Sequence, residues 1–97
     1  MEIKQTAMAG TLESSDIQIV LSQGSNGIEF DLTSDVMKQF GDDIKQTIED
    51  VLKAFKIDSA MVKVVDKGAL TPVIKARAIT ACQRALDMKD QPQWEVL

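Results

Sequence analysis

Apolar and polar residues alternate in two stretches of the N-terminal third of the chain, at residues 16–22 and 27–33. A period of two is typical of β-strands that bury one face and leave the other in water. The residues between them, 23–27, place glycines on both sides of Ser25 and Asn26, which favours a tight turn. We therefore expect two strands joined as a β-hairpin. The side chains expected to point inward are Ile17, Ile19, Leu21, Ile28, Phe30 and Leu32.

The period changes after residue 33, where apolar residues recur at steps of three and four. This spacing predicts an amphipathic helix over residues 34–55. Ser34 is a suitable N-cap, Asp35 favours the positive end of the helix dipole, and Lys53 and Lys56 suit its C-terminal end. Gly41 lies inside the helix at a cost of about 1 kcal/mol relative to alanine. The predicted apolar stripe consists of Val36, Phe40, Ile44, Ile48, Val51, Leu52 and Phe55.

Residues 60–65 are apolar and rich in β-branched side chains, which predicts a third strand. The turn residues Asp66-Lys67-Gly68 follow it, and Thr71-Pro72 opens a second helix, since proline suits the first helical turn. The order β-β-α-β-α predicts an α+β fold, in which a small antiparallel or mixed sheet packs on two helices. Residues 1–15 leave room for a short strand, and residues 89–97 are expected to form a loose tail. The predicted buried side of the second helix consists of Leu70, Ile74, Ala78, Ala81, Cys82, Ala85 and Leu86.

The length of 97 residues suits a single domain, and 44% hydrophobic with 27% charged residues indicates a globular chain. No stretch approaches the roughly 20 apolar residues that cross a bilayer, and the N-terminus lacks a signal-peptide pattern. The single cysteine excludes an internal disulfide and suits a reducing compartment. We therefore expect a cytoplasmic protein.

The acidic charge of the chain is concentrated near its N-terminus. The formal net charge is −4, and residues 1–35 hold six acidic residues against Lys4, a net charge of −5. A negative surface repels phosphate backbones, which argues against nucleic-acid binding. It would suit docking to basic patches on protein partners, but charge alone favours ordinary solubilising surface charge.

The residue types needed for most enzymatic catalysis are missing. The chain has no histidine and no tyrosine, so it offers no serine–histidine pair and no imidazole base. Metal-ligand spacing is also absent. Cys82 lies among apolar residues and is expected to pack in the core. The carboxylates of Asp42, Asp43, Glu49 and Asp50 are expected to form a solvated helix face rather than a metal or acid–base site. Trp94 could pack on the domain or on a partner.

Two serines occupy a short acidic segment before the first clear strand, Gly10-Thr11-Leu12-Glu13-Ser14-Ser15-Asp16. Neither can act as a nucleophile without an activating base. If the protein takes part in chemistry, a reactive group therefore has to be added to it, and an exposed serine hydroxyl is a natural attachment point. Composition alone does not separate Ser14 from Ser15, and it favours a plain polar loop, because serine-rich surface loops are common.

This segment resembles the attachment segment of the citrate lyase acyl carrier proteins, the γ subunits of that enzyme. Lys38-Gln39-Phe40-Gly41-Asp42 and Asp66-Lys67-Gly68-Ala69-Leu70 also look like that family's helix and turn segments. Chain length and element order fit as well, so the resemblance covers nearly the whole chain. Ordinary fatty-acid carriers differ, because they carry Asp-Ser-Leu at the start of a helix.

The resemblance implies that residues 1–15 hold the attachment site and that Ser14 carries a phosphodiester-linked 2′-(5″-phosphoribosyl)-3′-dephospho-coenzyme A. The terminal thiol of this arm would hold acetyl and citryl groups while citrate is cleaved to acetate and oxaloacetate. The implied partners are the α (acyl transferase) and β (lyase) subunits, a prosthetic-group transferase and an acetylating ligase. The chain itself would be non-catalytic.

Two further readings stay open at this stage. The similar carrier subunit of citramalate lyase is one, and an unmodified protein-interaction module is the other. Glu13 and Asp16 flank the two serines, and we hypothesise that they help the transferase to recognise the segment.

Overall fold

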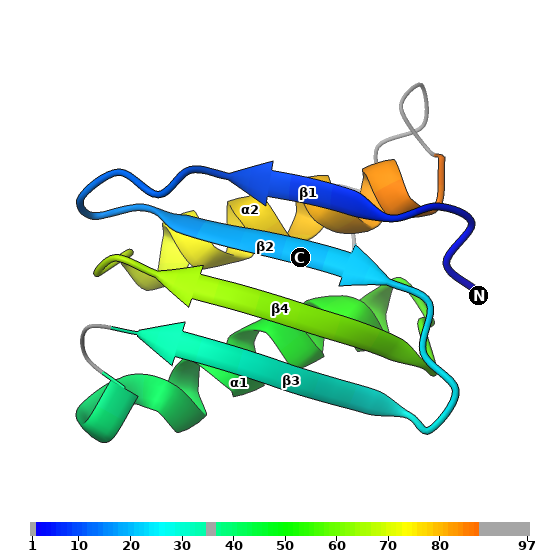
Figure 1. Ribbon diagram of the computed structural model, residues 1–97, viewed down its shortest axis with the longest axis horizontal. Coiled ribbons are helices and arrows are strands. Elements are labelled where there is room, and N and C mark those ends of the chain that lie inside the picture. The colour runs from blue at the N-terminus through cyan, green and yellow to red at the C-terminus, as the bar shows by residue number, and fades with distance from the viewer. Residues whose placement is uncertain (1, 35–36, 88–97) are drawn as a thin grey trace.

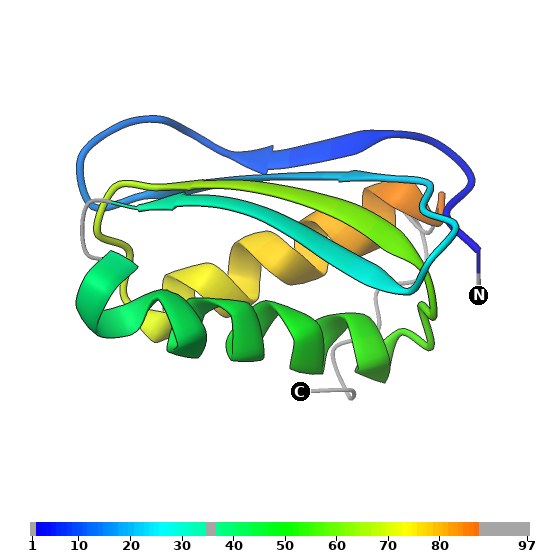
Figure 2. The same ribbon diagram turned by 60° about the horizontal axis from the view of Figure 1, so that its bottom comes forward.

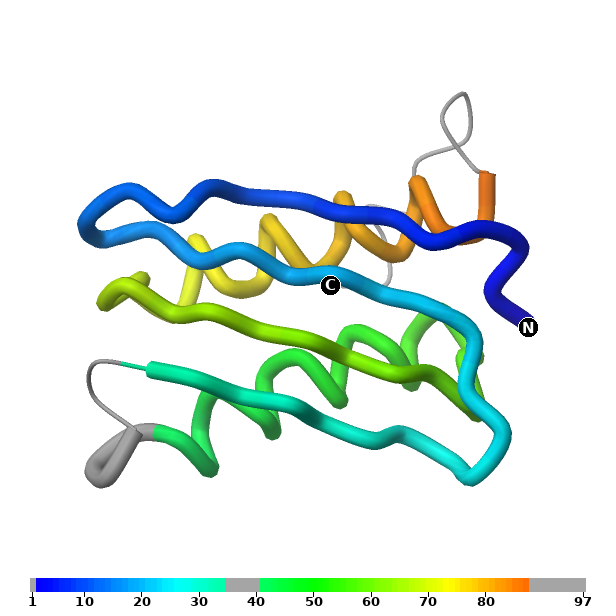
Figure 3. Tube along the Cα trace, viewed as in Figure 1, coloured from blue at the N-terminus to red at the C-terminus, as the bar shows by residue number. Residues whose placement is uncertain are grey.

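The computed structural model describes residues 2–34 and 37–87. Within these residues the chain forms four strands and two helices, seen as ribbons in Figure 1 and as a tube in Figure 3. Their order confirms an α+β fold, with a short N-terminal strand added to the predicted β-β-α-β-α series. The elements are β1 (Ala7–Gly10), β2 (Ile17–Ser22), β3 (Ile28–Ser34), α1 (Met37–Ala54), β4 (Ala60–Asp66) and α2 (Thr71–Ala85).

The four strands form one mixed sheet in the order β1-β2-β4-β3. β1 is antiparallel to β2, β2 is antiparallel to β4, and β3 runs parallel to β4. The predicted hairpin between β2 and β3 is therefore wrong, because β4 lies between these two strands (Figure 1). Helix α1 supplies the crossover connection that a parallel β3–β4 pair requires.

The connection between β2 and β3 wraps around the beginning of β4 instead of forming a hairpin turn. Gly24 lies against the backbone of Ala60, where an added Cβ would come within 2.8 Å of the Ala60 nitrogen and carbonyl carbon. The Ala60 amide also donates a hydrogen bond to the Gly27 carbonyl at 3.1 Å. A glycine at residue 24 thus allows the two backbones to approach closely.

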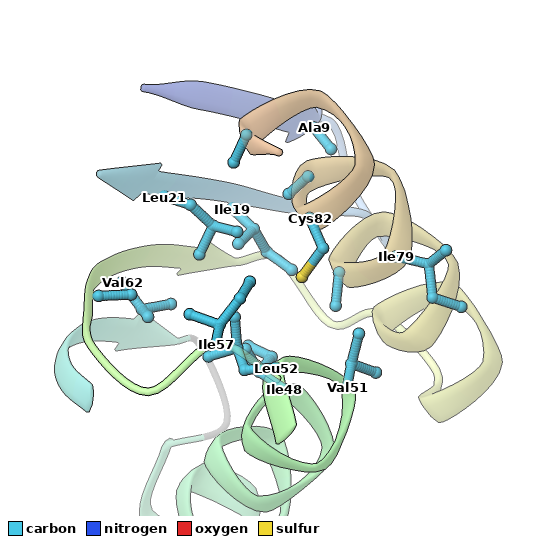
Figure 4. Packing of buried hydrophobic residues seen from close by; sticks show 14 of the residues in the cluster. Ala9, Ile19, Leu21, Ile48, Val51, Leu52, Ile57, Val62, Ile79 and Cys82 are labelled. Atoms are coloured by element: carbon cyan, nitrogen blue, oxygen red, sulfur yellow. The ribbon is translucent and has the colours of Figure 1, made fainter. Parts of the chain in front are cut away.

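Both helices cover the same face of the sheet, and no helix among the described residues covers the other face (Figure 2). The core between the two layers confirms most of the inward positions expected from the sequence (Figure 4). Ile28 and Phe30 are only partly buried, since β3 is an edge strand. Leu70 was expected to be buried, but 74% of its surface is exposed because it precedes α2 at the end of the molecule. The side chains with the least exposure include Ile17, Ile19, Leu21, Ile48, Leu52, Val62, Val64, Ile79 and Cys82.

The limits of α1 differ in part from the prediction. Ser34 is the last residue of β3 and pairs with Asp66, so its assignment as an N-cap is wrong. At the other end Lys56 has φ 60°, its amide bonds the Lys53 carbonyl, and the Ile57 amide bonds the Leu52 carbonyl. This is a Schellman C-cap, which ends the helix where the apolar pattern predicted. Asp35 lies outside the described residues, as do the side chains of Val36 and Phe40.

The N-terminal segment is fastened along α2. The amides of Lys4 and Gln5 both bond the Ala85 carbonyl, at 2.9 and 3.2 Å, and Arg84 donates a 2.7 Å hydrogen bond to the Met8 carbonyl. These contacts place β1 at the edge of the sheet, next to β2. Helix α2 itself begins at Thr71 with Pro72 in its first turn, as predicted. The expected tail, residues 89–97 with Trp94, lies outside the described residues.

Candidate functional site

The two serines lie in the loop that connects β1 to β2, residues 11–16. The last strand pair before the loop is Gly10 with Gln18, and the loop is closed by a turn in which the Asp16 amide bonds the Glu13 carbonyl at 3.1 Å. Ser14 and Ser15 are the two central residues of that turn, and both are exposed. The hairpin therefore presents two hydroxyl groups at its tip.

Asp16 fixes the base of this loop. Its carboxylate accepts hydrogen bonds from the Thr11 hydroxyl at 2.6 Å and from the Ile17 amide at 2.7 Å. Arg77 of α2 binds the same carboxylate with two nitrogens, Nε to Oδ1 at 3.1 Å and Nη2 to Oδ2 at 2.9 Å. A two-point arginine–carboxylate contact is a strong, oriented interaction. The loop is thereby held on the first half of α2.

A second contact holds the loop on the connection between β4 and α2. The Ser15 amide bonds the Lys67 carbonyl at 2.8 Å, and the Lys67 amide bonds the Asp16 carbonyl at 2.8 Å. These reciprocal bonds extend the β2–β4 pairing by one step beyond the strand ends. In Figures 1 and 2 the β1–β2 and β4–α2 connections accordingly lie together at one end of the molecule.

Buried Asp66 shapes the connection to which the loop is bound. Only 1% of its surface is exposed. Its Oδ1 accepts hydrogen bonds from the amides of Gly68 and Ala69 at 3.2 and 3.0 Å, and its Oδ2 accepts one from the Ser34 hydroxyl at 2.7 Å. Because these donors compensate the loss of water, the carboxylate can be buried while it organises the turn. Asp66 is therefore an indirect support of the serine loop.

The backbones of the two serines differ. Ser15 has φ 66° in the left-handed region, and its backbone amide donates a hydrogen bond to the Lys67 carbonyl. Ser14 has no such backbone constraint. Both side chains are exposed, and within the described part of the chain neither hydroxyl makes a hydrogen bond. The loop tip therefore offers two accessible hydroxyls, and the rigidly held backbone belongs to Ser15.

Asp16 has a structural role in addition to the hypothesised one. Its carboxylate points inward to Thr11 and Arg77, and only 14% of its side-chain surface is exposed. Glu13 is exposed. A test of transferase recognition by charge therefore has to be made at Glu13 alone, since reversing Asp16 would also disrupt the loop.

The predicted positions of Cys82 and of the carboxylates on the first helix agree with the structure. Cys82 is buried, and burial raises the pKa of its thiol to about 12. Asp42, Asp43 and Asp50 are exposed on α1, and Glu49 pairs with Lys53 at 3.4 Å. Among residues 2–34 and 37–87, no cluster of three potential ligands could hold a metal ion. None of the helices described here is both long enough and apolar enough to cross a bilayer.

The loop should lose part of its support in acid. The Arg77 guanidinium and the Thr11 hydroxyl hold the pKa of Asp16 well below its usual range. A carboxyl with a lowered folded-state pKa stabilises the fold above its unfolded value, near 3.8, and the stabilisation is lost as the pH falls below that value. We expect Asp16→Asn to lower the free energy of unfolding by about 1–2 kcal/mol at pH 7, a modest figure because Arg77 is partly exposed.

Urea unfolding of the wild type and Asp16→Asn at pH 7, 5, 4 and 3 measures this effect. The difference between the two proteins should stay constant from pH 7 to pH 5 and shrink toward pH 3. A difference of the same size at every pH would show that the Asp16 charge does not stabilise the loop. Glu13→Gln is the matched control, because it removes a neighbouring exposed carboxylate.

Several supports of the site were not apparent in the sequence. Arg77 is not among the residues that the apolar pattern places on the buried side of α2, and the sequence assigns Asp66 and Lys67 only to a turn. Arg77 and Asp16 are separated by 61 residues. An exposed arginine in an amphipathic helix carries no sign of its distant partner, so no local signal could have identified the pair. The serine loop itself was found because its residue types are unusual in their setting.

Comparison with known proteins agrees with this picture. A family model described as "ACP: Malonate decarboxylase delta subunit (MdcD)" matches residues 4–85. The citrate lyase acyl carrier protein of Leuconostoc mesenteroides subsp. cremoris is 69% identical over the full length of both chains. That of Lactococcus lactis subsp. lactis is 59% identical, again over the full length of both.

A solved structure shares the fold. One chain in the crystal structure of a Pseudomonas malonate decarboxylase hetero-tetramer in complex with malonate aligns with a TM-score of 0.74. The alignment covers 88% of each chain at 16% sequence identity. This likeness extends to the arrangement of strands and helices.

Proposed function

Because the chain belongs to the family of citrate lyase acyl carrier proteins, we propose that it carries acyl groups for citrate cleavage on a prosthetic group attached to Ser14. The single observation that supports attachment in this loop is its geometry. Its tip exposes two unengaged serine hydroxyls, while Asp16, Arg77 and Lys67 hold its base. The choice of Ser14 over Ser15 follows the family resemblance. The curated relatives named above favour citrate over citramalate as the substrate of the complex.

The prosthetic group is proposed to be 2′-(5″-phosphoribosyl)-3′-dephospho-coenzyme A, joined to the Ser14 oxygen through a phosphodiester. When bound, this group supplies a terminal thiol that carries acetyl or citryl as a thioester. An attachment oxygen at the tip of a hairpin is open to a modifying transferase and leaves the arm free to turn toward different partners. The fit rests on the exposure of Ser14 at the tip of the loop.

The residues of the chain position the arm and do not perform the chemistry. The Asp16–Arg77 contact and the Ser15–Lys67 hydrogen bond fix the point from which the arm extends. A fixed attachment point keeps the acyl group at a high effective concentration near the partner active sites. We assign the acid–base groups to those partners, because this chain contains no histidine. We propose that the partners are the α acyl transferase and β lyase subunits, with a prosthetic-group transferase and an acetylating ligase. The cytoplasmic location stays a prediction.

The intact mass of the protein purified from its native host tests this function. We expect one large phosphate-containing adduct, and fragmentation of the peptide spanning the loop should place it on Ser14. The citrate lyase activity of the same preparation has to be measured, so that the partners are known to be present. An unmodified mass in an active complex would overturn the proposal.

A further inference from the structure

An apolar groove lies between α1 and the start of α2. Its volume is about 370 Å³, and its lining includes Ile44 and Thr47 of α1 together with Ala69, Leu70 and Ile74. Most of its exposed lining is apolar, and Leu70 at its side is 74% exposed. Small-molecule sites are typically concave and apolar with a few polar groups, from about 300 Å³ upward. The groove has the size and the chemistry of such a site.

The groove and the serine loop share one structural support. The Ser15 amide donates a hydrogen bond to the Lys67 carbonyl. Gly68, the residue after Lys67, is part of the groove lining. The turn from Gly68 to Ala69 is held by buried Asp66. The residue that follows Ser14 is therefore hydrogen-bonded to the segment that continues into the groove lining. A larger cavity of about 460 Å³, lined by Gly24 and Asp58 among others, lies at the β2–β3 connection, the opposite end of the molecule in Figure 1.

On the premise that Ser14 carries the arm, we propose that this groove binds the thiol-bearing end of the arm between visits to the partner active sites. Apolar contacts with Ile44, Leu70 and Ile74 would bury the thiol and its linker, and the hydroxyls of Thr47 and Thr71 are available to the linker's amide groups. The groove would then shield a loaded thioester from water.

The charge of the groove adds a preference among acyl groups. Asp43 is the one ionisable side chain among the described residues that line it. Its carboxylate repels an acyl group that bears carboxylates, such as citryl, and leaves an uncharged one, such as acetyl, unaffected. The acetyl-loaded arm is therefore expected to rest in the groove, and the citryl-loaded arm is expected to leave it.

Two helix threonines provide a matched pair of variants. Thr47 lines the groove, whereas Thr80 of α2 does not. Both make the same local contact: the Thr47 hydroxyl donates a hydrogen bond to the Asp43 carbonyl, and the Thr80 hydroxyl donates one to the Ala76 carbonyl. Thr47→Phe fills the groove, and Thr80→Phe adds the same bulk elsewhere. Each protein is loaded with the arm by the transferase, and its mass confirms the loading before any measurement.

The reactivity of the arm's thiol with iodoacetamide is the first readout. If the thiol occupies the groove for about three quarters of the time, alkylation is slowed about fourfold, and Thr47→Phe should restore the rate of an unshielded thiol. Thr80→Phe should leave the rate at the wild-type value. Equal rates in all three proteins would overturn the proposal.

Amide chemical shifts of wild-type protein with and without the arm are the second readout, which needs no variant. We expect changes at Ile44, Thr47 and Ala69 in addition to those at the loop. They should persist with acetyl on the thiol and disappear with citryl. Changes confined to residues 11–17 in a protein whose mass shows the arm would overturn the groove and leave the proposed function standing. A protein that never acquires the arm would overturn the proposed function instead.

Discussion

Replacing Ser14 with alanine is expected to abolish attachment of the prosthetic group and, with it, the citrate lyase activity of the assembled complex. Alanine has no hydroxyl oxygen to form the phosphodiester. Because Ser14 is exposed and its hydroxyl is unengaged, the free energy of unfolding should change by no more than about 0.5 kcal/mol. The measurements are the intact mass after incubation with the transferase and the activity of the reconstituted complex.

Ser15→Gly is the matched control for this result. It removes the neighbouring hydroxyl, and glycine accepts the positive φ of 66° at this position without strain. The backbone amide that bonds Lys67 is kept. We expect Ser15→Gly to be loaded and active. An adduct on Ser14→Ala, or its loss from Ser15→Gly alone, would move the attachment site to Ser15.

Replacing Gly10 with alanine is expected to destabilise the hairpin that carries the serine loop by about 3–4 kcal/mol. Gly10 has φ 90°, a backbone conformation that residues with a Cβ rarely adopt. A Cβ at this position would also lie 1.7 Å from the Ile17 carbonyl oxygen, so the backbone of β1 or β2 must move. Urea denaturation of the purified proteins measures the loss.

Gly68→Ala separates the two causes of that loss. Gly68 has nearly the same φ, 93°, but an added Cβ there meets nothing within 4 Å. Its cost should be only that of the backbone conformation, about 1–2 kcal/mol. If both variants lose the same stability, the contact with the Ile17 carbonyl is not what requires glycine. Gly10→Ala should also be loaded by the transferase more slowly, because the strand pair that ends at the loop is displaced.

The positions of the strands in the sheet show the limit of sequence interpretation most clearly. The alternation in β2 and β3 correctly identified which side chains face the core, because a period of two follows from the geometry of one strand. It says nothing about which strand is the neighbour. Two strands separated by five residues resembled a hairpin, whereas β4 pairs with both of them. This arrangement requires the close contact of Gly24 with Ala60. In the sequence alone, Gly24 looks like an ordinary turn glycine.

The candidate site also has one part that the sequence could identify and one part that it could not. The serines could be singled out from the sequence because they stand in a short acidic segment that resembles the attachment segment of the family. Their support could not, since Asp16 binds Arg77 from a distant helix and Ser15 binds Lys67 from the end of β4. The structural role of Asp16 depends on these distant partners, and its part in transferase recognition stays a prediction.

By itself, the sequence determined the types of the elements, most of their buried faces, the burial of Cys82 and the serine segment proposed for attachment. Each of these depends on the periodicity or chemistry of residues close together in the chain. The tertiary structure alone decided the strand order, the support of the serine loop by Asp16 and Arg77, and the groove beside that loop. These depend on contacts between distant segments, whose partners are selected by the packing of the whole sheet and its two helices.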